Sequence, residues 1–475
     1  MGIKIYNTLS GEKEDFKPIK ENEVGIYSCG PTVYDYFHIG NARAFIVPDI
    51  IKRYLNYRGY KIFHVLNFTD IDDKMIKRAN QEEVTIEQLA NRFIKAYFED
   101  TDALNIRRAD IYPKATEHIE GMIDLVEKLI AKDYAYSSGG DVYFRVEKFD
   151  EYGKLSKQHL EDLEAGNRVE VSGVKENPLD FTLWKESKEG EPSWESPWGL
   201  GRPGWHIECS VMSTKYLGDR FDIHTGGVDL TFPHHENEVA QSEACCGHQV
   251  VNYWVHNGYI NIDGEKMSKS LDNFFTIREI LEKYKAEVIR FFLISKHYRS
   301  PINFSDSELD SAKKSLGRLL NTLDKVENLL DLDAVEGGGD KGLKGLAQET
   351  EVEFKEAMDD DFNTALAIAV LHTMVKEVNL IVNNKEFILT EGLKEGLKEI
   401  KSTFESLAGD VLGILPKQEE AKGGLIDPLI ELLVEVRSEV RKNKNYELAD
   451  KIRDELKNLG VQIKDTPQGV EWKLK

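Results

Sequence analysis

The chain has 475 residues, and 62 lysines and arginines against 84 aspartates and glutamates give it a formal net charge of −22. Its 41% apolar and 31% charged residues exclude a wholly disordered or collagen-like chain, and its length allows two to four domains. The acidic balance argues against nonspecific coating of nucleic acid, but it permits recognition of one nucleic acid through a local surface.

The sequence also indicates the cellular compartment, through its targeting signals and its number of cysteines. The amino-terminal residues lack the apolar core of a signal peptide, and no apolar run approaches the length of a membrane helix. Four cysteines are too few for a disulfide framework. We therefore expect reduced thiols, no membrane association and a cytoplasmic location.

The first patterned stretch predicts a strand–helix–strand unit. Residues 24–29 and 61–68 are short β-branched and aromatic runs, and residues 42–59 between them have helical spacing. Pro48 argues against an uninterrupted helix there. Helical spacing continues from about 86 to 133. Two strands joined by a helix predict a parallel sheet.

The middle of the chain is predicted to hold an insertion and then the second half of the sheet. Residues 137–146 have a hairpin pattern, and Gly, Pro and Trp then crowd together up to residue 200, which indicates an insertion with loops. Strand patterns return at 220–230 and 252–264, and helical spacing follows from 276.

The last third is predicted to be helical and divided by linkers. Residues 331–345 and 416–424 are rich in Gly and charge, and a helical segment lies between them. Residues 425–475 read as a small tail of two helical stretches and a strand-like end. The tail has ten basic and ten acidic residues, so the net negative charge lies upstream of it.

Histidine and cysteine crowd into one part of the second half. Six of the twelve histidines and three of the four cysteines lie between residues 206 and 256. His234 and Glu238 share one face of a helix predicted to start just after Pro233, and Cys209 belongs to the same crowded stretch. Imidazole, thiolate and carboxylate groups together indicate a metal site.

This ligand set has alternatives. Cys245, Cys246 and His248 form a rival set, although adjacent cysteines rarely both reach one ion, which favours helix packing for that pair. Cys29 lies far from the cluster and is by itself more readily explained as a small core residue. The chain has no CxxC pair, so spacing alone is weak evidence for zinc.

Two short motifs lie where phosphate could bind. The HIGN motif, residues 38–41, falls between the first predicted strand and helix, where free N–H groups and the helix dipole suit phosphate. Gly40 would let a nucleotide approach the backbone closely. The KMSKS motif, residues 266–270, follows a turn and precedes a helix, so its two lysines could neutralise a triphosphate. An ordinary loop is the alternative for each motif.

Together, these segments resemble a class I aminoacyl-tRNA synthetase, and specifically cysteinyl-tRNA synthetase. The resemblance runs from end to end of the chain. Asn41 stands where the general class I signature has a second histidine, and the cysteine branch has asparagine there. The segments that carry the resemblance are 28–43, 67–79, 201–213, 221–244, 257–274 and 448–473.

The resemblance implies an α/β fold with a class I Rossmann-type parallel sheet and an inserted connective domain, followed by a C-terminal helical bundle and a small α/β tail. It also implies a monomer. The expected domains are two halves of a catalytic domain (1–130 and 201–262), the connective insertion (131–200), a KMSKS-bearing stem-contact region (263–330), a tRNA-binding helical bundle (331–415) and an anticodon-recognition domain (416–475).

The resemblance further implies ATP-dependent ligation of L-cysteine to tRNA(Cys) through a cysteinyl-adenylate, with release of AMP and pyrophosphate. One Zn²⁺ per chain would select the substrate thiol, Mg²⁺ would accompany ATP, and no editing domain is expected. The implied zinc ligands are Cys29, Cys209, His234 and Glu238. The implied catalytic residues are His38, Asn41, Lys266 and Lys269. The implied ATP contacts are Gly40, His224, Gly226, Gly227, Asp229 and Lys269, and Thr69 and Trp205 would surround the bound cysteine.

Three other functions remain open at this stage. A ligase that joins cysteine to an amino-sugar would resemble a synthetase without the tail at 425–475. A non-enzymatic RNA-binding or zinc-dependent scaffold would be favoured by a broken KMSKS motif or a missing ligand, and both are intact. A persulfide-forming side activity would place pyridoxal phosphate on Lys74 and Lys77. Candidate anticodon contacts are Arg441, Lys442, Lys444, Arg453 and Trp472.

Overall fold

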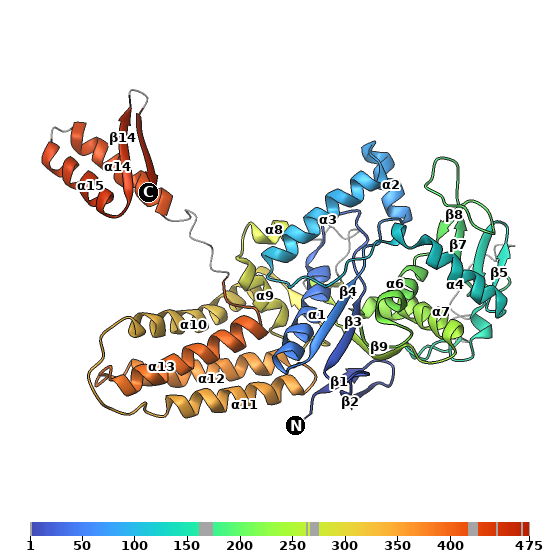
Figure 1. Cartoon of the computed structure of the whole chain (residues 1–475), viewed down its shortest axis with the longest axis horizontal. Coiled ribbons are helices and arrows are strands. Elements are labelled where there is room, and N and C mark those ends of the chain that lie inside the picture. The colour runs from blue at the N-terminus through green and yellow to red at the C-terminus, as the bar shows by residue number, and fades with distance from the viewer. Residues whose placement is uncertain are drawn as a thin grey trace. The chain divides into compact units, whose positions relative to one another are not determined.

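The computed structural model describes residues 2–160, 174–262, 265–266, 275–416, 426–442, 445–466 and 469–474. The chain divides into two compact units, 1–415 and 416–475. The first unit holds a parallel sheet, an inserted antiparallel sheet and a helical bundle, and the second is a small α/β unit (Figure 1).

A four-stranded parallel sheet forms the centre of the first unit. Its strands lie in the order β10-β9-β3-β4, and every neighbouring pair is parallel. The carboxyl ends of strands from both halves of the chain therefore meet at one edge, and the predicted parallel sheet is confirmed. The strands are β3 (Glu23–Ser28), β4 (Lys61–Leu66), β9 (Phe221–Gly227) and β10 (Val251–Asn257).

Helix α1 (Ile39–Tyr57) joins β3 to β4 and begins at that edge of the sheet. Pro48 lies inside it, so the expectation that proline would interrupt this helix was wrong. An interior proline costs about 3 kcal/mol. Most of α1 is buried, from Ile39 to Leu55, and this packing outweighs the local cost.

The helical stretch predicted from 86 to 133 comprises α3 (Ile86–Ala103) and α4 (Ile119–Ala131). The segment between them is extended and bridges to Val65 and Phe68 near the end of β4. A further helix, α2 (Asp73–Glu82), precedes them and was not predicted. Asp72 caps its amino terminus by accepting the N–H of Lys74 at 2.6 Å.

The insertion carries an antiparallel sheet in the order β5-β6-β7-β8. The predicted hairpin is confirmed as β5–β6, with Gly139 and Gly140 at positive φ in the turn. The expectation of loops beyond it was incomplete, because β7 and β8 are short strands among many turn-forming residues. The strands are β5 (Ala135–Ser138), β6 (Asp141–Phe144), β7 (Phe181–Glu186) and β8 (Gly201–Pro203).

After the insertion, α6 (Ile207–Leu217) leads into β9. A π-helical turn at Thr231–His235 follows β9 and continues as α7 (Glu236–Cys246). The helix predicted to start just after Pro233 therefore begins three residues beyond it. Beyond β10 lies a small sheet of β11 (Ile260–Ile262), β12 (Glu265–Lys266) and β13 (Ile302–Phe304), with α8 (Ile277–Leu281) and α9 (Ala286–Ile294) between the last two strands.

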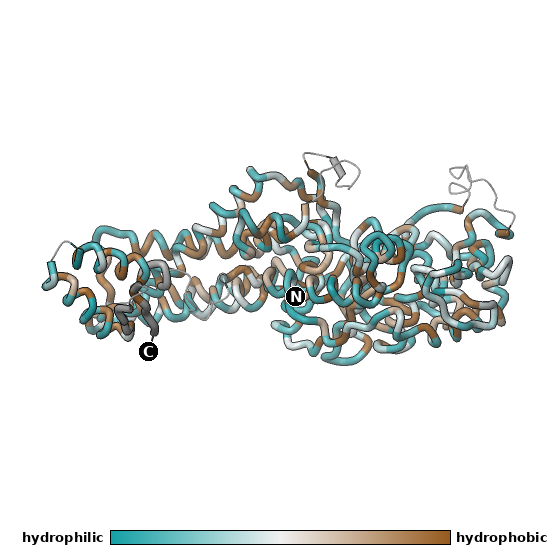
Figure 2. The backbone as a smooth tube through the Cα atoms, turned by 90° about the horizontal axis from the view of Figure 1, so that it is seen from above, coloured by the Kyte–Doolittle hydropathy of each residue, from teal (hydrophilic) through white to brown (hydrophobic). Residues whose placement is uncertain are grey.

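Four long helices form the bundle, and apolar and polar residues alternate along them (Figure 2). Among the described residues, α12 is the one helix long and apolar enough by mean composition to cross a membrane, although His372, Lys376 and Glu377 interrupt its apolar run. In the structure α12 packs against α10 and α11, which accounts for its apolar composition. The helices are α10 (Asp306–Leu330), α11 (Leu343–Asp359), α12 (Thr364–Val382) and α13 (Glu391–Phe404).

A buried cluster of arginines ties α1 and α9 to the end of the bundle. Arg53 and Arg290 pair with Asp49 at 2.8 and 2.5 Å. The same arginines donate to backbone carbonyls just beyond α13: Arg53 to Asp410 at 3.0 Å and Arg290 to Leu412 at 2.8 Å. The last residues of the first unit are therefore fixed to the helix that begins at the sheet edge.

The second unit has α14 (Ile426–Lys442), α15 (Tyr446–Asn458) and an antiparallel hairpin of β14 (Val461–Thr466) and β15 (Gly469–Leu474). Arg441 and Lys442 end α14, and Arg453 lies on α15, 3.3 Å from Asp450. Trp472 is on β15, but its side chain and the whole of Lys444 lie outside the described residues.

Candidate functional site

Four ligand-type side chains from separate segments meet at the carboxyl edge of the parallel sheet. Cys29 comes directly after β3, Cys209 lies in the first turn of α6, His234 lies in the π-helical turn and Glu238 lies in the first turn of α7. Their ligand atoms all lie within 4.8 Å of one another. The structure thus brings together the four predicted ligands, including Cys29, which spacing alone could not link to the other three.

The distances within this cluster fit a tetrahedral metal site. The two sulfurs are 3.6 Å apart, Cys209 Sγ lies 3.7 Å from His234 Nε2, and Cys29 Sγ lies 3.5 Å from Glu238 Oε1. Zinc bonds of about 2.0–2.3 Å put the corners of a tetrahedron roughly 3.3–3.8 Å apart. Two thiols, one imidazole and one carboxylate therefore match a zinc-type donor set.

A second, overlapping group consists of Cys29, His224, His235 and Glu238. Glu238 belongs to both groups: its Oε1 lies 3.0 Å from His234 and its Oε2 lies 2.9 Å from His224. Only the first group contains both thiols, which favours it for zinc. The rival set of Cys245, Cys246 and His248 is not among the candidate metal groups of the described residues.

The electrostatics of the cluster favour a cation. Burial alone would raise the pKa of Glu238, but His224 and His234 hold it well below its usual range. Burial likewise opposes the charged form of His234, yet hydrogen bonds to Cys209 and Glu238 raise its pKa to about 10. The hydrogen bond from Cys29 lowers the pKa of Cys209 to about 6. One thiolate and one carboxylate therefore lie side by side in a buried site.

Further side chains orient the ligands. His206 Nδ1 lies 2.9 Å from His234 Nδ1, and the Trp205 ring lies against the His234 ring at 4.3 Å between centroids. His235 Nδ1 lies 2.7 Å from His256 Nε2. The crowding of histidines in the sequence indicated this region, but it could not distinguish the histidine that is a ligand from the histidines around it.

The HIGN motif closes the first turn of α1. His38 Nδ1 accepts the N–H of Asn41 at 3.2 Å, and Asn41 Oδ1 accepts the N–H of His38 at 3.3 Å. Such a reciprocal cap fixes both side chains at the helix amino terminus. Gly40 lies in the same turn.

The chain on either side of KMSKS reaches this region. Lys266 is on β12, which pairs with β11, and Lys269 lies outside the described residues. Beyond the motif, Thr276 bridges to His38, and Ile39 donates its N–H to Phe275 at 3.2 Å. The segment following KMSKS is thus paired with the HIGN turn.

The end of β9 carries the predicted Gly-Gly-x-Asp segment. A Cβ at Gly226 would lie 2.5 Å from the His235 ring, and one at Gly227 would overlap the Asp229 carboxylate. Close packing against the buried His235 ring therefore favours glycine at Gly226, whereas at Gly227 the Asp229 carboxylate could turn aside. His224, two residues earlier, is only 1% exposed and stacks on Trp254 at 4.3 Å between centroids. Its side chain faces the metal cluster, and its predicted contact with adenosine stays a prediction.

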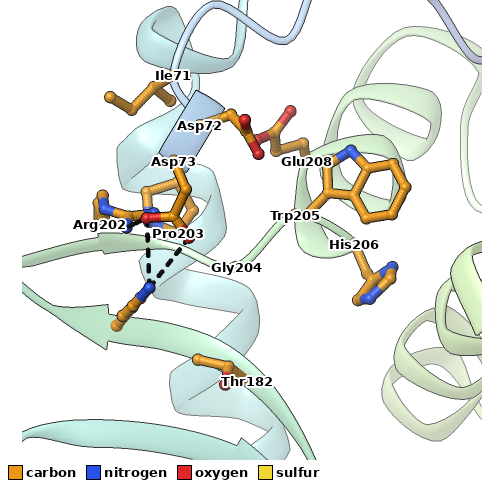
Figure 3. A pocket seen from close by; sticks show the side chains of 11 residues that line it. Ile71, Asp72, Asp73, Thr182, Arg202, Pro203, Gly204, Trp205, His206 and Glu208 are labelled. Carbon is orange, nitrogen blue, oxygen red and sulfur yellow. Dashed lines mark hydrogen bonds and ion pairs between the residues drawn. The ribbon is translucent and has the colours of Figure 1, made fainter. Parts of the chain in front are cut away.

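A cavity of about 260 Å³ opens between the start of α2 and the insertion sheet (Figure 3). Trp205 and Glu208 line it, and Trp205 is 43% exposed. Thr69 is buried and donates its hydroxyl proton to Glu208 Oε2 at 2.7 Å. Glu208 was not singled out from the sequence, where it is one acidic residue next to Cys209.

Comparisons with known proteins identify the class. A model of the class I (C) tRNA synthetase catalytic domain matches residues 15–314, and a DALR domain matches residues 353–416. The structure resembles Mycobacterium tuberculosis methionyl-tRNA synthetase in complex with methionyl-adenylate (TM-score 0.61, 17% identity, 82% of this chain and 92% of that chain). It also resembles a leucyl-tRNA synthetase of Agrobacterium radiobacter K84 (TM-score 0.59, 11% identity, 84% and 85%). The fold is that of a class I aminoacyl-tRNA synthetase.

Two curated proteins match over the full length. The cysteine–tRNA ligase of Thermococcus onnurineus (strain NA1) is 52% identical over 477 residues, covering 100% of this chain and 99% of that protein. The cysteine–tRNA ligase of Fusobacterium nucleatum subsp. nucleatum is 53% identical over 475 residues, covering 99% and 100%. The chain therefore belongs to the cysteine–tRNA ligase family, whose activity is the aminoacylation of tRNA with cysteine.

Proposed function

We propose that this chain charges tRNA(Cys) in two steps, through a cysteinyl-adenylate, and selects cysteine by its thiol. The cluster of Cys29, Cys209, His234 and Glu238 carries the proposal, because it is a buried donor set with tetrahedral spacing at the sheet edge. Class I folds place ligands at the carboxyl ends of parallel strands.

Thiol selection follows from the chemistry of the donor set. Zn²⁺ bound there would hold the substrate sulfur as a thiolate and bind the hydroxyl of serine poorly. A pocket that separates such neighbours by apolar contact alone gains only about 1–3 kcal/mol. With these four ligands in place, the substrate sulfur would bind as a fifth donor, an expansion of coordination that catalytic zinc allows. The Trp205 ring lies against the His234 ring. No editing domain is needed on this account.

The phosphate chemistry rests on positioning and charge. His38 and Asn41, held by their reciprocal cap, would stabilise the transferring α-phosphate at the start of α1, with Gly40 leaving room for the nucleotide. Lys266 and Lys269 would bind the β- and γ-phosphates together with Mg²⁺. Gly226, Gly227 and Asp229 would lie under the ribose. The carboxylate of cysteine attacks the α-phosphate and pyrophosphate leaves, so the protein supplies no nucleophile.

The tRNA would then be read by the helical bundle and the second unit, and its terminal 2′-hydroxyl would attack the adenylate. This assignment separates the chain from a cysteine–amino-sugar ligase, because a folded unit at 416–475 is present. Lys74 and Lys77, proposed for a persulfide side activity, are exposed on α2. We further propose a cytoplasmic monomer.

The test is aminoacylation of purified tRNA(Cys) with labelled cysteine, ATP and Mg²⁺, with serine as the competing substrate. We expect cysteine to be attached and serine to be excluded. Cys209→Ser should lose bound zinc, measured by mass spectrometry, together with its affinity for cysteine. Cys246→Ser, outside the cluster, is the matched control and should keep both. Unchanged zinc content in Cys209→Ser would refute the ligand assignment.

A further inference from the structure

Arg43 is a fully buried arginine in the second turn of α1, two residues after Asn41. Among the described residues its hydrogen-bond acceptors are all backbone carbonyl oxygens, and burial lowers the pKa of its guanidinium to about 10. The acceptors are the carbonyl oxygens of Gly258, Tyr259, His297 and Ser300, at 2.9, 3.1, 3.1 and 2.7 Å. Four bonds from one side chain thus join α1 to two other parts of the chain.

Two other buried arginines of the first unit have a carboxylate partner, because Arg53 and Arg290 both pair with Asp49. Arg43 has carbonyl dipoles instead, and a buried charge without a counter-ion is costly. The planar guanidinium carries its donors on a rigid fork, which suits it to joining carbonyls of separate segments. The role of Arg43 is therefore to be sought in the segments that it joins.

The two joined segments are the start of the small sheet and the loop of residues 297–300. Gly258 and Tyr259 directly precede β11, and the loop lies between α9 and β13. The segments are also bonded to each other, since Gly258 donates its N–H to the Tyr298 carbonyl at 2.9 Å. Beyond them, β11 and β13 pair in parallel. Arg43 therefore fastens the beginning of this small sheet to α1.

The KMSKS motif starts in the same small sheet. Lys266 is on β12 and pairs with Asn261 of β11, so the strand that leads into the motif follows the segment held by Arg43. The chain beyond the motif returns to the start of α1, where Thr276 bridges to His38. Both the entry to the motif and the exit from it are thus attached to α1 between residues 38 and 43.

We propose that Arg43 is a positioning residue for the nucleotide, which fixes the strand leading into KMSKS relative to the HIGN turn. The proposal rests on the proposed function, in which the two motifs bind the phosphates of one ATP molecule. Without the four bonds, the exit of the motif would stay attached while its entry could shift. A displacement of about 1 Å between groups that act on one substrate can cost about a hundredfold in rate.

The cysteine site should not depend on Arg43. The metal cluster is built on residues that follow β3 and on the first turns of α6 and α7, and Arg43 donates to none of these segments. A change in Arg43 is therefore expected to affect ATP and cysteine differently.

The loop of residues 297–300 has a second anchor on the bundle. Asp361, between α11 and α12, is fully buried and accepts hydrogen bonds from the Tyr298 hydroxyl at 2.7 Å and from Arg299 Nε at 2.8 Å. The loop therefore keeps its attachment to the bundle when the bonds from Arg43 are lost. We expect a substitution of Arg43 to change the spacing between α1 and the small sheet and to leave the chain folded.

The test measures cysteine-dependent exchange of labelled pyrophosphate into ATP by the zinc-loaded, full-length protein. Arg43→Lys keeps the positive charge, but its single nitrogen cannot span the carbonyls that the guanidinium fork joins. We expect kcat/KM for ATP to fall about tenfold or more. The KM for cysteine should stay within about twofold of its original value, and the zinc content should not change.

A matched control separates positioning from general stability. Arg290 is also fully buried and donates to three backbone carbonyls, but these lie at the ends of α3 and of the bundle. Arg290→Lys should keep kcat/KM for ATP within about twofold, even where thermal unfolding shows that it lowers stability. An equal loss of kcat/KM for ATP in Arg290→Lys and Arg43→Lys would overturn the proposal.

A second variant disturbs the same junction without changing Arg43. A Cβ at Gly258 would lie 2.5 Å from the Arg299 carbonyl oxygen, so Gly258→Ala must push the start of β11 away from the loop. It should show the same selective loss for ATP, and it provides the test if Arg43→Lys does not fold. Unchanged kcat/KM for ATP, or an equal rise in KM for ATP and for cysteine, would overturn the role of Arg43. Absence of exchange in the unmodified protein would instead overturn the proposed function.

Discussion

At the scale of single residues, the site depends on Cys29 more than its isolated position in the sequence suggests. Its sulfur lies 3.6 Å from that of Cys209, which is 180 residues away along the chain. The β3 register places Cys29 at the sheet edge, and Asn67 fixes the following turn by accepting the N–H of Gly30 at 2.9 Å. Cys29 is therefore part of the cysteine–histidine–glutamate cluster, and not only a small core residue.

The histidine-rich stretch could be recognised from sequence, but the role of each histidine could not. His234 and His235 are neighbours in the chain, and their rings contact different partners, Cys209 and His256. The π-helical turn sets these directions, and no local pattern predicts such a turn. Glu208 was missed for a related reason: its burial and its hydrogen bond from Thr69 are properties of the folded chain.

Asp100 provides a residue-scale prediction about pH. It is 4% exposed and accepts a hydrogen bond from Arg278 at 2.8 Å, and burial, only partly opposed by Arg278, raises its pKa to about 6. The folded chain holds this proton more tightly than the unfolded chain, so raising the pH from about 4 to 7 lowers the free energy of unfolding. We expect the stability of Asp100→Asn relative to the unmodified protein to increase by roughly 2–3 kcal/mol over this range.

Urea unfolding at several pH values would measure this difference. Glu99→Gln is the matched control, because Glu99 pairs with the same arginine at the surface; it should follow the pH dependence of the unmodified protein. A constant difference between Asp100→Asn and the unmodified protein would contradict the prediction.

At the scale of elements, helices and strands could be predicted from the sequence where the apolar residues follow one clear period. The four strands of the parallel sheet and the helices on either side follow from apolar patterns. Prediction failed at Pro48 and at β7 and β8, where tertiary packing and cross-strand pairing override the local pattern. Helix α2 was missed because it has only ten residues, and its buried face consists of Met75, Ile76 and Ala79, which is a short signal to read from sequence.

Two glycines give an element-scale prediction with opposite signs. A Cβ at Gly30 would overlap the backbone carbonyl oxygen of Asn67, so Gly30→Ala must displace the loop that follows β3. We expect a loss of about 1–3 kcal/mol in the free energy of unfolding. Gly317 lies inside α10 with nothing within 4 Å of its Cβ position, so Gly317→Ala should add up to about 1 kcal/mol. Equal effects of the two substitutions in thermal unfolding would contradict this account.

At the scale of the whole molecule, the chain separates the chemistry from part of the proposed tRNA recognition. The metal cluster, the HIGN turn and the bundle all belong to the first unit, and the second unit has its own small core of Ile430, Val434, Leu456 and Val461. The family match covers residues 15–314 and 353–416, all but the last of which belong to the first unit.

A chain that ends at Leu415 should therefore keep its adenylation chemistry. We expect cysteine-dependent exchange of pyrophosphate into ATP within about twofold of the full-length value. Charging of tRNA should fall by about a hundredfold or more, because one of two linked contacts with the tRNA is lost. Loss of pyrophosphate exchange in a folded truncated chain would show that the second unit takes part in the first chemical step.

The arginine cluster around Asp49 has a mechanical consequence. The peptide that leaves the first unit is anchored, through Arg53 and Arg290, to the middle of α1. The other end of that 19-residue helix carries the His38 cap. Tension on this peptide would therefore act on the part of α1 between Arg53 and the His38 cap, roughly 20 Å of helix, and not on a flexible loop.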